Sequence, residues 1–285
     1  MGVSVDLDSS WSGPDQSARF HAAEFSCLAP QSTSRTRVLA GSPSRPSAPT
    51  IFIRMRKLIL FDIDGTILST AGAGRRAIHR AIVDHLGPEY SADGIRFDGK
   101  TDPQIVTELL ERAGHTGRVT EDLIGVVCDL YLERLELELK MNRGLVKLYP
   151  GVRELLARLT QRSDCVVGLL TGNLERGAYL KLTSAGLETS QFRVGAFGSD
   201  AANRSELPAI AAARASELMG RVPTREDVVI LGDTPADVTC GSAIRARAIG
   251  VATGSYRVDQ LQSFGAFSVF DDFSDSEAVE TAIFA

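Results

Sequence analysis

Short apolar segments and helical patterns follow one another in a regular order along the chain from Lys57 to its end. Short apolar segments that end in Gly, Asp or Thr are typical of buried strands. Six such segments are present: KLILFDIDG, DCVVGLLTGN, FRVGAFGSD, DVVILGDTP, ARAIGVATG and, more weakly, SVFDDF. Helical patterns separate them, among others at 152–159, 174–185, 207–219 and 236–243. Continuous apolar strands that alternate with helices predict an α/β fold with a doubly wound parallel sheet.

The interval between the first two predicted strands contains helical patterns only. In AGRRAIHRAIVDHL, DPQIVTELLERA and EDLIGVVCDLYLERLELELK the apolar positions recur every three or four residues. This interval is too long for one crossover between parallel strands. We therefore expect a helical cap domain at 70–147, inserted into a catalytic core formed by 55–69 and 148–285.

Residues 1–54 differ in composition from the rest of the chain. The stretch 31–50 is rich in Ser, Thr, Pro and Arg, and such a segment buries too little apolar surface to fold. We interpret 1–54 as a disordered tail, or as a mis-assigned start upstream of a true start at Met55. A targeting peptide is the less favoured interpretation, because acidic residues occur early in this segment.

Charge and cysteine content narrow the choice of partners and location. The net charge is −5 and the pI about 5.5, with no dominant basic face, so nucleic acid is not expected as a partner. No apolar run approaches the roughly 18 residues of a membrane helix. The four cysteines are far apart in the sequence, which favours a reducing, cytoplasmic location.

The first candidate site is FDIDGT, where two carboxylates stand two residues apart at the end of an apolar strand. Strand alternation places Asp62 and Asp64 on one side, and the carboxyl ends of parallel strands form the ligand crevice. Two ionised carboxylates this close require a cation, and Mg²⁺ prefers oxygen ligands. Taken alone, the motif is more often a strand followed by an Asp-Gly turn.

Two further strands end in oxygen-rich segments. In LLTGN, the hydroxyl of Thr171 and the region of Gly172 and Asn173 can form an anion site at a helix start, although an ordinary helix cap has the same sequence. In ILGDTPAD, Asp233 adds a third carboxylate to the crevice. Asp237 stands at the next helix start, where it can equally be a surface acid that the helix dipole stabilises.

Together the motifs DIDGT, the Thr of LLTGN and GDTPAD resemble those of the haloacid dehalogenase superfamily. The resemblance extends from about Lys57 to the C-terminus. It implies a Rossmann-like core, a mobile helical cap of the first class, and Mg²⁺-dependent phosphoryl transfer through an aspartyl-phosphate. GKTDPQI, at 99–105, resembles the cap segment of the phosphoglycolate-phosphatase-like branch.

The resemblance also implies roles for individual residues. Asp62 matches the nucleophile, and Asp64 the general acid/base that protonates the leaving oxygen and then activates water. Thr171 matches the phosphate-holding residue. The Mg²⁺ ligands would be Asp62, the backbone carbonyl of Asp64, and Asp233, while Asp237 would support them from behind.

Members of this superfamily also need a cation, usually Lys, which precedes the GDTPAD motif in the sequence and neutralises the phosphoryl group. No Lys follows Lys181 in the sequence, so an Arg has to serve. Arg204 is our candidate, because it lies between a strand end and a helix. Arg214 is the weaker alternative, since its position is typical of a mid-helix surface residue.

In the cap segment, Lys100 and Asp102 are candidates for reaching the substrate when the cap closes. The alternative is that the segment only caps a helix, for which Thr101 and Pro103 are well suited.

These features favour an Mg²⁺-dependent phosphatase that hydrolyses a small phosphorylated metabolite and acts as a monomer or homodimer. A phosphomutase has the same motifs, and a phosphonatase would need a cap amine such as Lys100 or Lys140. A non-catalytic phosphate-binding regulatory protein is disfavoured because the acidic motifs are intact. The motifs do not identify the substrate, since cap residues set specificity.

We predict that residues 1–54 are dispensable. A truncated protein that begins at Met55 should fold and keep the activity of the full chain, because the removed segment is poor in core-forming residues. Soluble yield and kcat/KM of the two proteins, measured side by side, test this. Loss of soluble, active protein on truncation would contradict the interpretation.

Overall fold

The computed structural model describes residues 57–88, 90, 94–115 and 119–285. The chain divides into two units, 1–50 and 51–285, and all described elements belong to the second. The prediction for residues 1–54 lies outside the described residues. Among the described residues, no helix has the length and apolar character that a membrane crossing requires.

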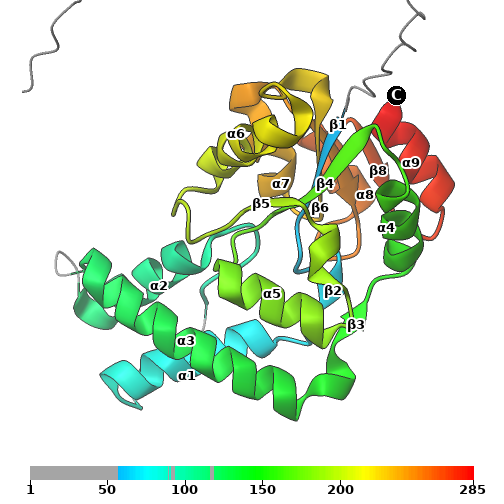
Figure 1. Ribbon diagram of the computed structural model, residues 1–285. Coiled ribbons are helices and arrows are strands. Elements are labelled where there is room, and N and C mark those ends of the chain that lie inside the picture. The colour runs from blue at the N-terminus through cyan, green and yellow to red at the C-terminus, as the bar shows by residue number, and fades with distance from the viewer. Residues whose placement is uncertain (1–56, 89, 91–93, 116–118) are drawn as a thin grey trace, which may run out of the picture. The chain divides into compact units, whose positions relative to one another are not determined.

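A six-stranded sheet in which every neighbouring pair is parallel forms the centre of this unit (Figure 1). Its strands coincide with the six apolar segments of the sequence, which confirms the predicted doubly wound α/β fold. In spatial order they are β5 (Val194–Ala196), β4 (Cys165–Leu170), β1 (Lys57–Phe61), β6 (Val228–Gly232), β7 (Arg247–Val251) and β8 (Ser268–Phe270).

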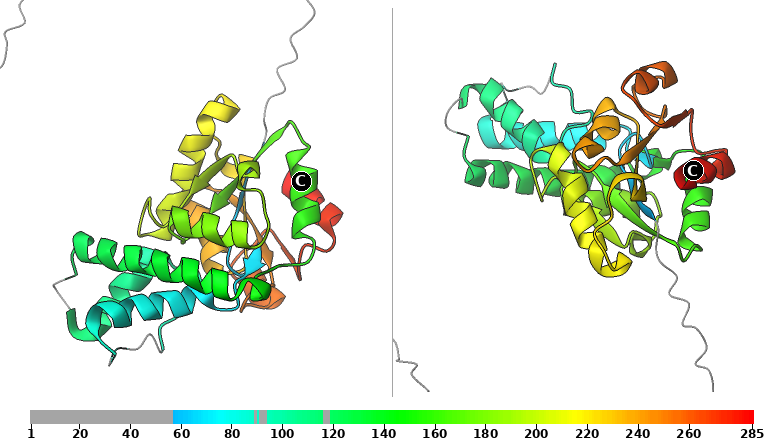
Figure 2. Two further views of the ribbon diagram at one scale, coloured as in Figure 1. Left: turned by 60° about the horizontal axis from the view of Figure 1, so that its bottom comes forward. Right: turned by 90° about the horizontal axis from the view of Figure 1, so that it is seen from above.

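Helices cover both faces of the sheet, because the strand side chains are apolar on both sides. Every residue of β1 is buried, and its side chains contribute alternately to two separate core clusters. One face packs against α4 (Val152–Thr160), α5 (Glu175–Ser184) and α9 (Ser276–Phe284). The other packs against α6 (Leu207–Met219) and α7 (Pro235–Cys240). Figure 2 shows α4 and α9 on one side of the sheet and α6 on the other.

The segment 70–147 folds into helices, as its periodicity predicts. These are α1 (Ala73–Leu86), α2 (Asp102–Leu110) and α3 (Glu121–Met141), and they bury their apolar stripes in a cluster of their own. Helices α1 and α3 lie side by side (Figures 1 and 2). The short antiparallel pair β2 (Leu68–Ser69) and β3 (Lys147–Leu148) joins the two ends of this segment. The division into core and cap with the stated boundaries stays a prediction.

The remaining elements are short. Helix α8 (Val258–Ser263) contacts β7 and β8, and neither α8 nor α9 was predicted. One π-helical turn follows α2, at Glu111–His115. The 3-10 turns are Arg143–Leu145, Thr189–Gln191, Arg204–Glu206, Arg225–Asp227 and Gly241–Ile244.

The register of the three central strands positions the polar motifs. Phe61 of β1 lies opposite Leu169 of β4 and Leu231 of β6. The residues that follow these three strands therefore come together at the same edge of the sheet.

Candidate active site

The three polar strand ends surround one cavity of about 440 Å³. Residues of the helical segment form its other wall, including Gly74, Arg75 and Ile78 from α1 and the loop before α2. The lining contains every predicted site residue except Asp237: Asp62, Asp64, Lys100, Asp102, Thr171, Gly172, Asn173, Arg204 and Asp233. It also contains Lys181, which was not predicted.

Asp62 follows β1 directly and is almost fully buried at the base of the cavity. Its backbone N–H donates to the Leu231 carbonyl at 2.9 Å, which fixes the main chain between β1 and β6. Its Oδ1 accepts a hydrogen bond from Arg204 Nη2, also at 2.9 Å. The same nitrogen donates to the Leu170 carbonyl at 3.3 Å and pairs with Asp237. The predicted nucleophile and the predicted cation therefore form a buried ion pair.

Arg214, the alternative cation, lies on the surface of α6. It donates to Asp200 and to the Gly195 carbonyl, each at 2.7 Å, and its side chain is 46% exposed. In contrast, the Arg204 side chain is 7% exposed, and its Nε has no hydrogen-bond partner among the described residues. The charges of Asp237 and Asp62 raise the pKa of Arg204 further, although burial lowers it, so the guanidinium stays charged.

Asp233 follows β6 and faces Asp62 across the sheet edge. Its Oδ1 accepts a hydrogen bond from Thr66 Oγ1 at 2.9 Å. Two glycines leave room for its carboxylate: an added Cβ would lie 2.4 Å from Oδ2 at Gly65 and 1.8 Å from it at Gly254. Gly65 also has a φ of +86°, which favours glycine. The backbone is thus shaped around this carboxylate.

Asp237 has a structural task at the start of α7. Its Oδ2 accepts from the Thr234 backbone N–H at 3.0 Å and from the Thr234 hydroxyl at 2.6 Å, which completes a capping box. Its other oxygen pairs with Arg204. Asp237 therefore is not a surface acid, and it orients the cation that contacts Asp62.

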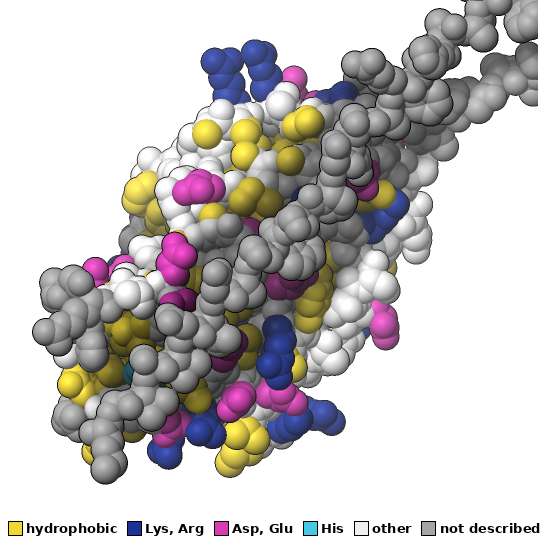
Figure 3. All heavy atoms as spheres, turned by 60° about the vertical axis from the view of Figure 1, so that its left-hand side comes forward, with side chains coloured by type: hydrophobic (Ala, Val, Ile, Leu, Met, Phe, Trp, Pro, Cys, Tyr) yellow, Lys and Arg dark blue, Asp and Glu magenta, His cyan; other side chains and the backbone are white. Residues whose placement is uncertain are grey.

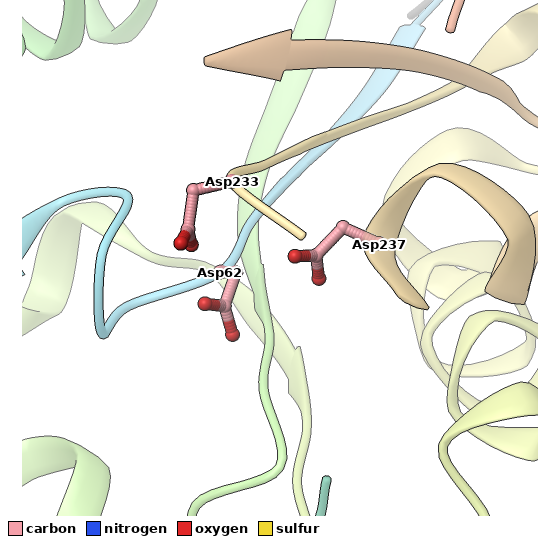
Figure 4. A group of neighbouring side chains, drawn as sticks. All are labelled: Asp62, Asp233 and Asp237. Carbon is pink, nitrogen blue, oxygen red and sulfur yellow. The ribbon is translucent and has the colours of Figure 1, made fainter. Parts of the chain in front are cut away.

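The carboxyl groups of Asp62, Asp233 and Asp237 gather at one point (Figure 4). Each offers an oxygen within 4.8 Å of the others, and all three residues are buried. Burial raises the pKa of Asp62 to about 7, with Arg204 lowering it and Asp237 raising it. Burial, Asp237 and Asp62 raise the pKa of Asp233 well above its ordinary value. A hard divalent cation fits this all-oxygen cluster, because it would favour the ionised carboxylates.

Thr171 and Gly172 follow β4, which pairs with β1 on the side opposite to β6. Thr171 is fully buried, and its backbone N–H donates to the Ala196 carbonyl at 3.0 Å. The Gly172 carbonyl accepts from the Asp102 N–H at 2.7 Å, and a Cβ at Gly172 would lie 2.0 Å from the Lys100 carbonyl oxygen. The loop that precedes α2 therefore packs directly on the LLTGN motif.

Asn173 connects the LLTGN motif to the FDIDGT motif. Its Nδ2 donates to Asp64 Oδ2 at 2.8 Å and to Thr171 Oγ1 at 2.7 Å. Its Oδ1 accepts from Lys181 Nζ, which also donates to Asp64 Oδ2 at 2.5 Å. The side chain of Asn173, predicted to bind substrate, is thus engaged between protein groups.

Lys181 is a buried cation of the cavity wall that the sequence motifs did not predict. A lysine in the middle of a helix is usually solvated, so its position alone does not mark it as a site residue. A signal was available, however. Lys181 lies three residues after Ala178 and one before Leu182, and all three belong to the buried face of α5.

Lys100 and Asp102 belong to the loop and first turn of α2. Lys100 lines the cavity and pairs with Glu108. Thr101 caps the helix by accepting from the Gln104 N–H at 3.2 Å, and Pro103 occupies its first turn, as the capping interpretation predicts. Asp102 is buried, and its Oδ2 accepts from the Leu174 N–H at 2.9 Å.

A family model described as haloacid dehalogenase-like hydrolase matches residues 56–245. The chain belongs to this family. The resemblance in the three motifs is thereby confirmed, and the matched range includes all the predicted site residues.

Among curated proteins, this hydrolase is similar to the phosphoglycolate phosphatase of Pseudomonas putida, with 21% identity over 76% of each chain. Among solved structures, it is similar to CbbY from Rhodobacter sphaeroides in complex with phosphate, with 20% identity and a TM-score of 0.61 over 78% of this chain and 96% of that one. A β-phosphoglucomutase from Clostridium difficile gives 16% identity and a TM-score of 0.60 over 81% and 97%. These similarities agree with the haloacid dehalogenase-like fold.

Proposed function

We propose that this hydrolase is a phosphatase that cleaves a small phosphate monoester through an aspartyl-phosphate on Asp62. The observation that carries the proposal is the buried Asp62 carboxylate. It lies at the base of the cavity, held on one oxygen by Arg204 and close to Asp233. A carboxylate that is fixed, desolvated and backed by a cation is suited to attack a phosphorus atom.

In the first step, an oxygen of Asp62 forms a bond to phosphorus while the bond to the leaving oxygen breaks. Asp64 gives its proton to that leaving oxygen. In the second step, Asp64 takes a proton from water, the water oxygen attacks the phosphorus, and inorganic phosphate leaves while the Asp62 carboxylate is restored. Arg204 balances negative charge at Asp62 in both steps.

We propose Mg²⁺ as the cofactor, held by Asp62, Asp233 and the backbone carbonyl of Asp64. When bound, the ion would neutralise charge between the carboxylates and the phosphoryl group. The buried all-oxygen cluster and the two glycines that leave room for Asp233 support this assignment. Asp237 is excluded from our ligand set because both of its oxygens already have protein partners.

The proposed partner is a small phosphorylated metabolite. Support comes from the size of the cavity, and from the Pseudomonas putida relative that is named for its action on phosphoglycolate. On the face shown in Figure 3, the described Lys and Arg side chains lie among Asp and Glu side chains, which does not favour a nucleic acid. We propose a cytoplasmic location, since Cys128, Cys165 and Cys240 are free thiols.

A phosphomutase is the second candidate, because a β-phosphoglucomutase has the same fold. The two functions differ in whether water or a second hydroxyl accepts the phosphoryl group. Release of inorganic phosphate from a panel of metabolite phosphates would identify the phosphatase, and isomerisation without release would identify the mutase.

We expect turnover to require magnesium. Excess chelator should lower the hydrolysis rate of an aryl phosphate by at least about 100-fold, since the carboxylates would repel the phosphate dianion. Added Mg²⁺ should restore the rate, and Ca²⁺ should substitute poorly because it accepts looser geometries. Full activity in chelator would refute the metal assignment, and no hydrolysis of any phosphate ester with Mg²⁺ would refute the enzyme.

A further inference from the structure

Lys181 places a buried ammonium group beside the predicted acid/base residue. Its side chain is 4% exposed, yet its Nζ reaches the cavity wall from the middle of α5. The amine donates to Asp64 Oδ2 and to Asn173 Oδ1, each at 2.5 Å. A buried lysine is costly to a fold unless other charges compensate it. Its presence here therefore calls for an explanation beyond packing.

The surroundings keep this amine charged. Burial alone would lower the pKa of Lys181, but the charges of Asp64 and Asp102 raise it, and the pKa ends above its ordinary value. Asp64 pairs directly with the amine, whereas Asp102 acts at longer range from the first turn of α2. Lys181 therefore lies between two carboxylates, with Asp64 in direct contact and Asp102 further away.

Asp64 needs such a partner because little else restrains its side chain. The residue lies in the turn after β1, and its side chain is 42% exposed to the cavity. Its Oδ2 accepts from both Lys181 and Asn173, and Asn173 is held in turn by Thr171. These contacts fix Oδ2, which leaves the other carboxylate oxygen for a ligand in the cavity.

The helical segment closes over the same amine. A Cβ added at Gly74, in the first turn of α1, would lie 3.4 Å from Lys181 Nζ and 3.8 Å from the Tyr131 hydroxyl. Tyr131 is buried in the helical cluster and hydrogen-bonds Asp102. Residues of α1, α2 and α3 therefore contribute to the environment of Lys181.

We propose that Lys181 is a positioning residue that holds the Asp64 carboxylate in the orientation needed for proton transfer. This inference rests on the proposed function, in which Asp64 serves both chemical steps. Arg204 acts on Asp62 and the phosphoryl group, so the two buried cations divide the site between nucleophile and acid/base.

The kinetic test uses Lys181→Met, which keeps the length of the side chain and removes the charge. With phenyl phosphate, whose leaving oxygen needs a proton, we expect kcat to fall by about 100-fold. With 2,4-dinitrophenyl phosphate, phosphorylation should be nearly unchanged, but water activation should be slow. The phosphoenzyme should then accumulate in acid-quenched mass spectrometry. An equal loss for both substrates without accumulation would overturn the proposal.

Two further variants separate positioning from folding. Lys140→Met removes an exposed lysine that pairs with Glu136 on α3, and it should behave as the unsubstituted protein. The double variant Lys181→Met/Asp102→Asn removes both buried charges and should fold even where the single variant does not. It should keep the leaving-group dependence of Lys181→Met. If the double variant regains the activity of Asp102→Asn alone, Lys181 serves only as a counterion of Asp102, and the proposal is wrong.

A crystal structure of the double variant provides a readout that needs no turnover. The Asp64 carboxylate should leave Asn173 and occupy more than one orientation. An Asp64 side chain that stays in place on Asn173 would overturn the positioning role. An unsubstituted protein that hydrolyses no phosphate ester would instead refute the proposed function, and the crystallographic result would still decide the role of Lys181.

Discussion

Asp62→Asn should abolish phosphoryl transfer, with a loss on the order of 10⁴-fold or more, as for other nucleophile replacements. The amide keeps the shape of the side chain and an oxygen that can accept from Arg204. It lacks the negative charge that attacks phosphorus and that would bind a metal ion. Because Arg204 keeps its ion pair with Asp237, loss of this charge should not destabilise the fold.

Acid-quenched mass spectrometry after a pulse of activated aryl phosphate provides the measurement. The unsubstituted protein should show a transient phosphoryl adduct, and Asp62→Asn should show none. Asp64→Asn is the matched control, since it changes the neighbouring carboxylate of the same motif. It should still be phosphorylated, and the adduct should persist because water is no longer activated. A phosphorylated Asp62→Asn protein, with the adduct mapped elsewhere, would remove Asp62 from the nucleophile role.

The sheet was predictable because parallel strands buried on both faces have a one-dimensional signature. KLILF, CVVGLL and VVILG are almost wholly apolar, and each is followed at once by a polar turn. The β2–β3 pair has no such signature, because two residues per strand give no periodicity. Helix α8 has only six residues, and its sequence VDQLQS contains only two apolar residues.

The candidate site was predictable where its residues belong to strand ends. Asp62, Thr171 and Asp233 follow three adjacent strands whose register brings them to one edge. Asn173 and Arg204, which connect these residues, were also predicted, but Lys181 comes from a helix and no motif reports it. Lys181 reaches Asp64 because α5 packs its buried face on the sheet, a tertiary contact that no local pattern contains.

The difference between Asp64 and Asp237 shows the same limit. In the sequence each is an acidic residue shortly after an Asp at a strand end: Asp64 stands two positions after Asp62, and Asp237 four positions after Asp233. The structure leaves Asp64 half-exposed to the cavity and buries Asp237 in a capping box with Thr234. Burial and hydrogen bonding, rather than spacing, decide which carboxylate is free to meet a ligand.

Arg204→Met should have the second-largest effect, because it removes the cation between Asp62 and Asp237. Loss of one partner from a buried ion pair costs about 3–5 kcal/mol of stability. Activity should fall by a further factor of about 10²–10³, as when a single charge-stabilising donor is removed from an active site. Arg204→Lys, which restores the cation usual in this family, should keep the fold and lose less activity. Its single ammonium replaces a planar group that here contacts both carboxylates and the Leu170 carbonyl.

Arg214→Met is the matched control, since it removes the other arginine considered for this role. Its ion pair with Asp200 is exposed, and exposed pairs contribute about 0–1 kcal/mol. Chemical denaturation of the three variants, and kcat/KM at saturating Mg²⁺, give the comparison. If Arg214→Met loses more activity than Arg204→Lys, the surface arginine takes part in catalysis and Arg204 is only a structural counterion. If the order is the expected one, the buried guanidinium is the cation that this chain uses in place of lysine.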